Sequence, residues 1–344
     1  MTREVAGKAG RGYFLEDFAV GQILSHAVPR TVTRGDLAVY NCIYGDRHPL
    51  YTSDPFARSC GLNASPVHDL LVFHIVFGKT VGDLSLNAIA NLGYAEARFL
   101  KPVNYGDTLH AHSKVIGIKE NSNGRTGIIW VETTGLDQSE TPVLTYKRWV
   151  MIRKRNEKEP PCETVVPATL PAVPAEDLPV PRGLDFRVFD TGATGETYRV
   201  GDYTVGEMID HVDCTTLTDT EHMLATRIYH NTARVHFDIN ARPDRQRLIY
   251  GGHMISLARA FTCNGLANAQ IILAINSGTH VNPAFAGETV TARTEVIDHA
   301  DHPTPGAGAL RLRTRLGRTG DDGIDPYDDA NLLLDLDYWC LMPR

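Results

Sequence analysis

The chain contains the same sequence pattern twice, and this internal repeat is the strongest constraint on its fold. Most matching segments lie at an offset of 185 residues, and later ones drift by a few positions, as expected when loops change length. A single repeat of this length is far too long for a solenoid unit, so the repeat indicates a duplicated domain. The clearest matches pair Phe18-Ala-Val-Gly21 with Tyr203-Thr-Val-Gly206, Thr31-Val-Thr33 with Thr216-Leu-Thr218, and Ile43-Tyr44 with Ile228-Tyr229.

A proline-rich segment separates the two copies. Residues 157–181 contain seven prolines, which favour an extended, semi-rigid connection over a flexible one. The length of 344 residues suits two domains of ordinary size. We therefore predict an N-terminal domain over residues 1–156, a linker over 157–181 and a C-terminal domain over 182–344.

Bulk composition excludes several classes of protein. A net charge of −7 argues against a general nucleic-acid-binding protein, which usually has a basic face. No stretch approaches the ~20 apolar residues of a membrane span, and the N-terminus lacks the apolar core of a signal peptide. The six cysteines are scattered and form no Cys-x-x-Cys pair or zinc-type spacing. We expect a cytoplasmic protein with reduced thiols and no metal.

Each half has the pattern of an antiparallel sheet around one long helix. The segment 67–81 is almost entirely apolar, which predicts a buried helix, and 253–268 is its counterpart in the second copy. Four segments that follow the first helix alternate between apolar and polar residues, as antiparallel strands do when one face is packed. They are 91–100, 108–116, 126–135 and 143–153. The predicted class is α+β, with this unit made twice.

The loop Gly45-Asp-Arg-His-Pro-Leu-Tyr51 resembles the signature of MaoC-like hydratases, which reads Gly-Asp-x-Asn-Pro-Leu-His. The segment 98–108, with its Pro/Gly turn, resembles a second hallmark of that family. Over about 330 residues, linker included, the chain resembles the double-length mesaconyl-CoA hydratase branch. The resemblance implies a double hot-dog fold and the reversible hydration of mesaconyl-CoA to β-methylmalyl-CoA, in the ethylmalonyl-CoA route or a related cycle. It also implies that CoA enters as part of the substrate and that no separate cofactor is needed.

The chemistry of such hydratases requires three elements. A carboxylate, helped by an imidazole, must position and deprotonate water. A dry pocket must hold the acyl group, and backbone N–H groups at a helix N-terminus must stabilise the enolate-like thioester oxygen. By resemblance, the helix starts at Pro66–Asp69 and Tyr250–His253 would supply these donors.

Neither copy keeps the complete pair of the family motif. Asp46 stands at the Asp position of the first copy, but Tyr51 replaces its His and His48 its Asn. In the second copy His236 stands at the His position, while Asn231 replaces the Asp. Three arrangements remain open: Asp46 acting with His48 or Tyr51, which we favour at this point; His236 acting with Asn231, which orients water; and one site that combines Asp46 with His236.

The substrate contacts can be assigned only by topology and by the free carboxylate of a mesaconyl group. Arg47 is the first candidate to bind that carboxylate, with Arg58 and Lys101 as alternatives. Three segments beside the motif loop and the buried helix are expected to contact the acyl-CoA. They comprise Cys60, Gly61, Leu62 and Asn63; Asp83, Leu84, Ser85 and Leu86; and Tyr94, Ala95 and Glu96.

Other functions fit the same pattern. A general (R)-specific enoyl-CoA hydratase or a hot-dog acyl-CoA thioesterase would share the fold and the ligand. The incomplete motif in both halves also allows a non-catalytic acyl-CoA-binding protein. Further homo-oligomerisation is expected, although the duplication already pairs two hot-dog units.

Overall fold

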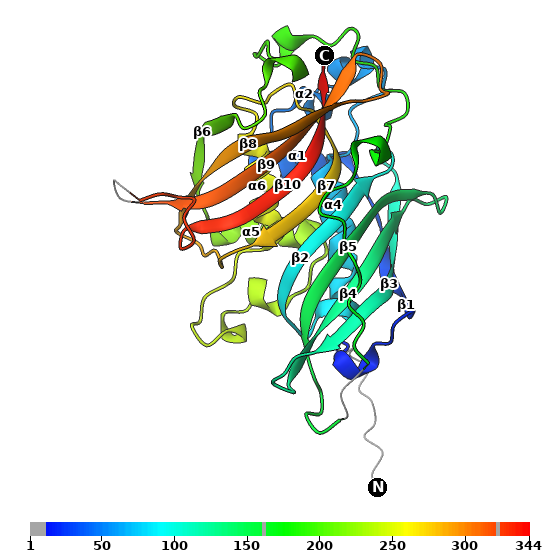
Figure 1. Ribbon diagram of the computed structural model, residues 1–344, viewed down its shortest axis with the longest axis vertical. Helices are drawn as coiled ribbons and strands as arrows, with labels where there is room; N and C mark the ends of the chain where they lie inside the picture. The colour runs from blue at the N-terminus through cyan, green and yellow to red at the C-terminus, as the bar shows by residue number, and fades with distance from the viewer. Residues whose placement is uncertain (1–11, 160–162, 321–323) are drawn as a thin grey trace.

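The two halves share one continuous sheet in this computed structural model, which describes residues 12–159, 163–320 and 324–344. All neighbouring strands are antiparallel, in the order β1-β3-β4-β5-β2-β7-β10-β9-β8-β6 (Figure 1). The strands are β1 (Ile23–Thr31), β2 (Ala88–Phe99), β3 (Thr108–Glu120), β4 (Thr126–Leu136), β5 (Pro142–Arg153), β6 (Met208–Thr216), β7 (Ile271–His280), β8 (Thr289–Asp301), β9 (Ala307–Thr319) and β10 (Leu332–Pro343).

Counted inward from either edge of the sheet, equivalent strands of the two halves come in the same order, because the second half repeats the first. The halves meet where β2 pairs with β7, with Tyr94 opposite Gly278 and Ala95 opposite Ser277. This pairing gives each half a neighbour for a strand that would otherwise be an open edge. The expected α+β class, with an antiparallel sheet around a buried helix in each copy, is confirmed.

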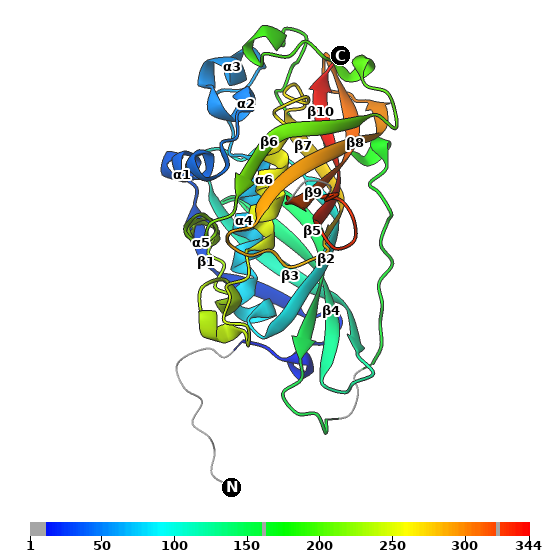
Figure 2. The same ribbon diagram turned by 90° about the vertical axis from the view of Figure 1, so that its left-hand side faces the viewer.

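Two helices, α4 and α6, lie against the inner face of the sheet, and the other helices lie outside them (Figure 2). Every residue of α4 is buried, which explains its lack of a polar face. The second buried helix, α6, ends with the hydroxyl of Thr262 donating to the carbonyl of Arg259. The helices are α1 (Arg34–Tyr44), α2 (Pro49–Thr52), α3 (Asp54–Ser59), α4 (Asp69–Lys79), α5 (Asp219–Ile228) and α6 (Gly251–Phe261).

Both buried helices are shorter than the sequence pattern predicts. In the first copy α4 stops at Lys79, and a π-helical turn over Val81–Ser85 continues the apolar run. In the second copy α6 begins two residues early, because Tyr250 is extended and acts as its N-cap. Gly265, whose φ is +94°, lies in the turns that follow α6. Apolar periodicity marks what is buried, but it does not mark where helical hydrogen bonding stops.

The described part of the linker crosses the outer face of the sheet, away from α4 and α6 (Figure 2). Val165 forms an isolated antiparallel bridge with Ile118. The indole of Trp339 donates to the carbonyl of Val173 at 3.1 Å, which fixes the linker to β10. These contacts hold the described part of the linker against the sheet. Residues 160–162, which include Cys162, lie outside the described ranges.

The longest helices, α1, α4 and α6, have 11 residues each. None of the helices in the described ranges has the length and apolarity that a membrane span requires.

Candidate active site

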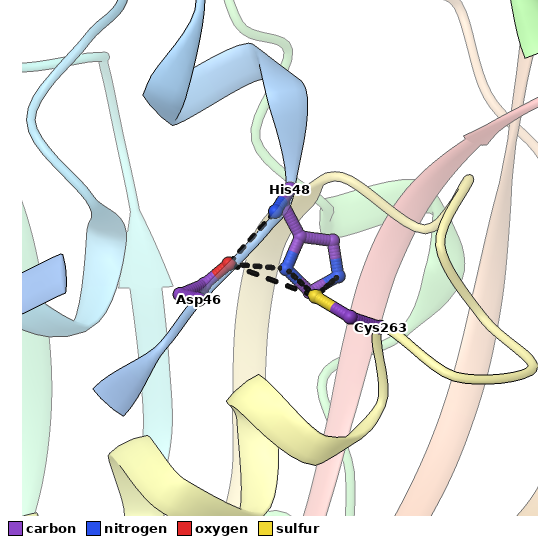
Figure 3. A group of neighbouring side chains, drawn as sticks. All are labelled: Asp46, His48 and Cys263. Carbon is purple, nitrogen blue, oxygen red and sulfur yellow. Dashed lines mark hydrogen bonds and ion pairs between the residues drawn. The ribbon is translucent and has the colours of Figure 1, made fainter. Parts of the chain in front are cut away.

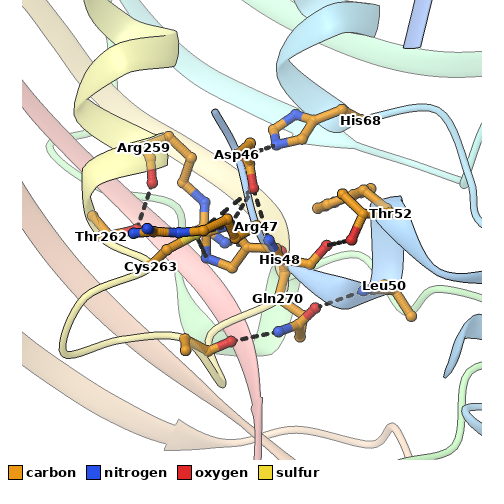
Figure 4. A network of polar contacts seen from close by, with 12 residues as sticks. Asp46, Arg47, His48, Leu50, Thr52, His68, Arg259, Thr262, Cys263 and Gln270 are labelled. Carbon is orange, nitrogen blue, oxygen red and sulfur yellow. Dashed lines mark hydrogen bonds and ion pairs between the residues drawn. The ribbon is translucent and has the colours of Figure 1, made fainter. Parts of the chain in front are cut away.

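The motif of the first copy forms a buried network centred on Asp46, in the loop between α1 and α2 (Figures 3 and 4). One carboxylate oxygen accepts hydrogen bonds from the backbone N–H and from Nδ1 of His48, at 2.9 and 2.7 Å. The other accepts from Nε2 of His68 at 2.9 Å. Because Nδ1 of His68 accepts the backbone N–H of Leu70, the proton of this imidazole is on Nε2 and points to Asp46.

These contacts make Asp46 a stable anion. Burial alone would raise the pKa of its carboxyl, but the electrostatic interactions and hydrogen bonds with His48 and His68 outweigh burial and hold the pKa well below its usual range. Burial, followed by the charge of Arg259, lowers the pKa of His48 to about 4. At neutral pH the arrangement is therefore a carboxylate that accepts from the neutral imidazole of His48 and from Nε2 of His68. A carboxylate with such a low pKa is a weak general base.

Residues from the second half occupy the space in front of Asp46. Sγ of Cys263, which follows the end of α6, lies 3.0 Å from Nδ1 of His48 and 3.7 Å from Asp46 (Figure 3). Arg259, also on α6, is fully buried and donates to the hydroxyl of Thr262 at 2.6 Å and to the carbonyl of Gln270 at 2.9 Å (Figure 4). The predicted pair of Asp46 and His48 does meet, but it meets inside packed protein.

Asp46, His48 and Cys263 also place one possible metal-ligand atom each within 4.8 Å of one another. Metal binding would require the thiolate of Cys263. Burial, followed by the charge of Asp46, raises the pKa of this thiol to about 12. The sequence prediction of no metal therefore stays a prediction, and the thiol in this network is protonated at neutral pH.

Two other residues of the first motif have partners away from Asp46. The hydroxyl of Tyr51 donates to the carboxylate of Asp69 on α4 at 2.5 Å, and the backbone N–H of Ile272 donates to the same oxygen at 2.8 Å. Tyr51 therefore does not complete a pair with Asp46. The guanidinium of Arg47 forms an ion pair with Asp213 of the second half at 2.5 Å, and its side chain is 61% exposed.

The motif of the second copy has a different environment. Nδ1 of His236 lies 2.8 Å from the carbonyl oxygen of Leu248. A carbonyl can only accept, so Nδ1 carries the proton and Nε2 keeps its lone pair. Burial lowers the pKa of His236 to about 4, so this imidazole is neutral at physiological pH. Asn231 accepts the backbone N–H of Ala233 at 2.9 Å through its amide oxygen.

His236 and Asn231 line a cavity of about 620 Å³ that lies between the two halves. The first half contributes the end of α4, the turn after it, and side chains of β2 and β5. The second half contributes the motif loop and the start of α6. The residues that line it include Phe77, Ser85, Leu86, Tyr94, Arg148, Asn231, His236, Tyr250, Gly251 and His280.

The N-terminus of α6 opens on this cavity. Tyr250, its N-cap residue, makes no side-chain capping bond, and the first N–H groups of a helix have no partner within the helix. The helix then begins with Gly251 and Gly252, whose backbone can approach a ligand closely. By contrast, His68 caps α4 through its own Nδ1, and the carboxylate of Asp69 lies in the first turn. Of the two buried helices, α6 is thus the one whose N-terminus combines uncapped donors with a neighbouring cavity.

The motif loop of the second copy also lines a second cavity, of about 780 Å³. Asn231 lines both cavities, and Lys79, Asp83, Arg227 and His230 line this one. Neither cavity is lined by Asp46 or His48. Asp46 and His236 share no hydrogen bond within the described ranges, since Asp46 binds His48 and His68 while His236 binds Leu248.

The structure places some of the predicted substrate contacts beside a cavity and others away from one. Ser85, Leu86 and Tyr94 line the cavity of His236. Asp83 contacts Nδ1 of His26 at 2.8 Å and faces the second cavity. Leu84 is in a hydrophobic cluster.

The other predicted contacts hold the protein together. A carboxylate oxygen of Glu96 accepts from Lys147 at 2.7 Å and from the backbone of Leu170 in the linker at 2.9 Å, and its neighbour Ala95 is buried in β2. The segment of Cys60, Gly61, Leu62 and Asn63 packs against the start of the second half: the carbonyl of Cys60 accepts from Asp185 at 2.9 Å. A Cβ at Gly61 would meet the carbonyl oxygen of Gly183 at 2.2 Å. These residues line neither cavity.

Sequence reasoning missed Arg148 and His280, which both line the cavity of His236. A signal for Arg148 was present, because it shares the period-two buried face of its strand with Tyr146 and Val150. A charge at an inward position of a strand indicates a functional role. His280 ends β7, and no local motif marks it.

Comparisons with known proteins agree with this architecture. Residues 2–314 match the family described as mesaconyl-CoA hydratase. Mesaconyl-CoA hydratase of Cereibacter sphaeroides is 55% identical over 342 residues, which covers 98% of this chain and all of that protein. β-Methylmalyl-CoA dehydratase of Chloroflexus aurantiacus is 49% identical and covers 99% of both chains.

Solved structures show the same fold. A MaoC domain protein dehydratase from Chloroflexus aurantiacus has a TM-score of 0.94 at 49% identity, covering 98% of this chain and 99% of that one. A Mycobacterium tuberculosis protein described as having a double hotdog fold has a TM-score of 0.79 at 25% identity, covering 96% of this chain and 98% of that one. The predicted double hot-dog fold is confirmed.

Proposed function

The chain belongs to the mesaconyl-CoA hydratase family, and we propose that it catalyses the reversible hydration of mesaconyl-CoA to β-methylmalyl-CoA in the cavity that contains His236. It is a hydro-lyase. The observation that carries the choice of site is that an imidazole with a free lone pair and an uncapped helix N-terminus line one cavity. The second of the three arrangements open from sequence is therefore preferred over the one that relies on Asp46.

In the proposed reaction the acyl group lies in the cavity with its thioester oxygen at the start of α6. Water adds to the β-carbon: His236 Nε2 takes one proton from it, and the hydroxyl forms the new C–O bond. The resulting enolate oxygen accepts hydrogen bonds from the first N–H groups of α6, at Gly251 and Gly252. The proton on His236 then moves to the α-carbon, which completes the addition and restores the neutral imidazole.

Asn231 supports the same step without acting as a base. Its amide oxygen already accepts the Ala233 N–H, which orients the NH₂ group as the remaining donor. A neutral donor can hold the oxygen of water or of the new hydroxyl. It also adds no negative charge beside a substrate that carries a free carboxylate.

CoA enters as part of the substrate, and the proposed steps use only protein groups. The phosphates of CoA are best placed at the mouth of the cavity, where arginines gather. Arg153 is exposed there and has no ion-pair partner within the described ranges, whereas Arg234 and Arg242 are paired with Asp238 and Asp244. Homo-oligomerisation and a cytoplasmic location stay predictions from the sequence.

The test follows the loss of enoyl absorbance when the purified protein is added to mesaconyl-CoA, with crotonyl-CoA in parallel and free thiol measured throughout. We expect turnover of mesaconyl-CoA without thiol release. His236→Gln should abolish turnover, whereas folded Asp46→Asn and His48→Gln should retain it. Loss of turnover in folded Asp46→Asn alone would move the chemistry to the first motif. Thiol release would indicate a thioesterase, and binding without turnover would contradict the enzyme assignment.

A further inference from the structure

We propose that Arg148 binds the free carboxylate of the acyl group and thereby sets the preference for dicarboxylic acyl-CoA substrates. This inference rests on the proposed function, because it concerns the same cavity and the same substrate. It replaces Arg47 as the carboxylate-binding residue, since Arg47 is largely exposed, is already paired with Asp213, and lines neither cavity.

Arg148 is a cation held inside the protein without a counter-ion. Arg148 is only 2% exposed. Nε donates to the amide oxygen of Asn91 at 2.7 Å, and Nη1 donates to the hydroxyl of Thr80 at 2.9 Å. The guanidinium carbon lies 3.9 Å from the centre of the Phe77 ring. Arg148 forms no ion pair with any Asp or Glu in the described part of the chain.

Such an arrangement is unfavourable unless an anion completes it. Taking a charged group out of water costs several kcal/mol when no opposite charge repays it. Burial lowers the pKa of Arg148, yet a guanidinium remains protonated across the physiological range. Neutral partners hold Nε and Nη1, so the fork is fixed in orientation, while Nη2 donates to no protein acceptor within the described ranges. A preorganised guanidinium with a free edge is a binding site for a planar anion.

Arg148 lies in the cavity in which the substrate carboxylate would have to be bound. In mesaconyl-CoA the free carboxylate is attached to the β-carbon, which is the carbon that receives water. A group that binds this carboxylate must therefore lie in the same cavity as the base and the oxyanion donors, and Arg148 lines the cavity with His236 and Gly251. The CoA phosphates are separated from the acyl group by the pantetheine arm, so they are the less suitable anion for a residue this deeply buried.

The aromatic neighbours of Arg148 also favour a bound carboxylate. Phe77 covers one face of its guanidinium, and Tyr94 of the neighbouring strand lines the same cavity. Aromatic neighbours exclude water, which strengthens a charge-assisted hydrogen bond to a carboxylate. An acyl-CoA with a methyl group in place of the carboxylate would leave this cation unpaired and desolvated. Discrimination therefore arises from the unsatisfied charge as well as from the added contact.

The experiment uses two substrates that differ only at this group. Mesaconyl-CoA and 2-methylcrotonyl-CoA share the methyl-branched enoyl thioester, and a methyl group replaces the carboxylate in the second. We expect Arg148→Met to lower the ratio of their kcat/KM values about 100-fold, the effect of losing one buried charge-assisted pair. Arg148→Lys, which keeps the charge but loses the fork, should fall between the wild type and Arg148→Met.

Controls separate binding from folding. Thermal unfolding confirms that each variant is folded, and Arg313→Met removes an arginine that pairs with Asp335 between β9 and β10, away from the cavity. If Arg148→Met is inactive with both substrates, inhibition constants of the saturated analogues methylsuccinyl-CoA and 2-methylbutanoyl-CoA supply the same ratio without turnover. A purely structural role would weaken both analogues equally and would overturn the inference.

The outcomes distinguish this inference from the proposed function. Absence of mesaconyl-CoA turnover by the wild type would contradict the function itself. Turnover by the wild type with an unchanged substrate ratio in Arg148→Met would contradict only the role of Arg148. A fall in the ratio in Arg47→Met, and not in Arg148→Met, would return the carboxylate contact to the motif loop.

Discussion

The hydroxyls of Tyr44 and Tyr229, which occupy the same position in the two copies of the repeat, lie 2.8 Å apart and share a hydrogen bond. Tyr44 ends α1 and Tyr229 follows α5, so the bond joins the two halves at equivalent points of the repeat. The hydroxyl of Tyr44 also lies 3.2 Å from Nδ1 of His253 at the start of α6. The duplication thus places a tyrosine pair beside the candidate oxyanion donors.

Removal of the Tyr44 hydroxyl should destabilise the protein more than removal of its counterpart. Tyr44→Phe leaves both Tyr229 and His253 without this partner, so we expect a loss of about 2 kcal/mol in the free energy of unfolding, against about 1 kcal/mol for Tyr229→Phe. Urea unfolding of the single and double variants measures the coupling. Strictly additive losses would show that the hydroxyls do not interact.

A methyl group at the start of α6 should stop catalysis. A Cβ at position 251 would lie 2.4 Å from Nε2 of His280 and 2.5 Å from its Cε1, so the helix terminus or the imidazole must move. We expect Gly251→Ala to lower kcat/KM for mesaconyl-CoA by about 100-fold or more, as loss of an oxyanion donor does. Gly201→Ala is the control, since a Cβ there meets nothing within 4 Å. Normal turnover by Gly251→Ala would exclude the α6 terminus from the site.

The pH dependence of turnover should reflect the lowered pKa of His236. The base works in its neutral form, and burial lowers its pKa to about 4. The active form therefore persists as the pH falls past 6.5, and kcat/KM should remain level down to about pH 5 and decline towards pH 4. Circular dichroism at each pH checks that the fold persists. A break in the profile near pH 6.5 would indicate a solvated histidine as the base.

An added carboxylate at position 231 should disfavour dicarboxylic substrates. Asn231→Asp restores the residue of the general MaoC-like motif, but it places a negative charge in the cavity that must accept the substrate carboxylate. We expect the kcat/KM ratio of mesaconyl-CoA to 2-methylcrotonyl-CoA to fall about tenfold or more, because juxtaposed like charges repel by more than 1 kcal/mol. Asn240→Asp adds the same charge at an exposed position of the cavity and should have a smaller effect. An equal or larger ratio in Asn231→Asp would contradict this reasoning.

Asp46 is expected to contribute to stability. Its pKa is held well below the usual range, so its contribution is fully present above the pKa of about 3.8 of an unfolded aspartate and is lost as the pH falls through the lower, folded value. We expect Asp46→Asn to lower the free energy of unfolding by about 3 kcal/mol at pH 7, the effect of breaking a buried ionic network. Urea titrations at pH 7 and pH 3 test this. Wild-type stability in Asp46→Asn would contradict it.

The sequence by itself determined the duplication, the fold class and the family. These properties are local or repetitive: the period of apolar residues marks the strands and buried helices, and matches such as Tyr44 with Tyr229 mark the duplication. Local motifs also identified His236 and Gly251 at the start of α6, which both line the cavity.

Only the tertiary structure decided how the two motifs differ in their surroundings. From the sequence alone, Asp46 is a candidate catalytic carboxylate. In the structure Cys263 and Arg259, more than 200 residues later in the chain, fill the space around it. In the sequence Arg148 is one basic residue in a strand. In the structure Asn91, Thr80 and Phe77 surround it, and no carboxylate of the described residues pairs with it. The physical reason is that pKa, solvent access and the cost of an unpaired charge depend on neighbours in space. In a double hot-dog those neighbours come from the other half of the chain.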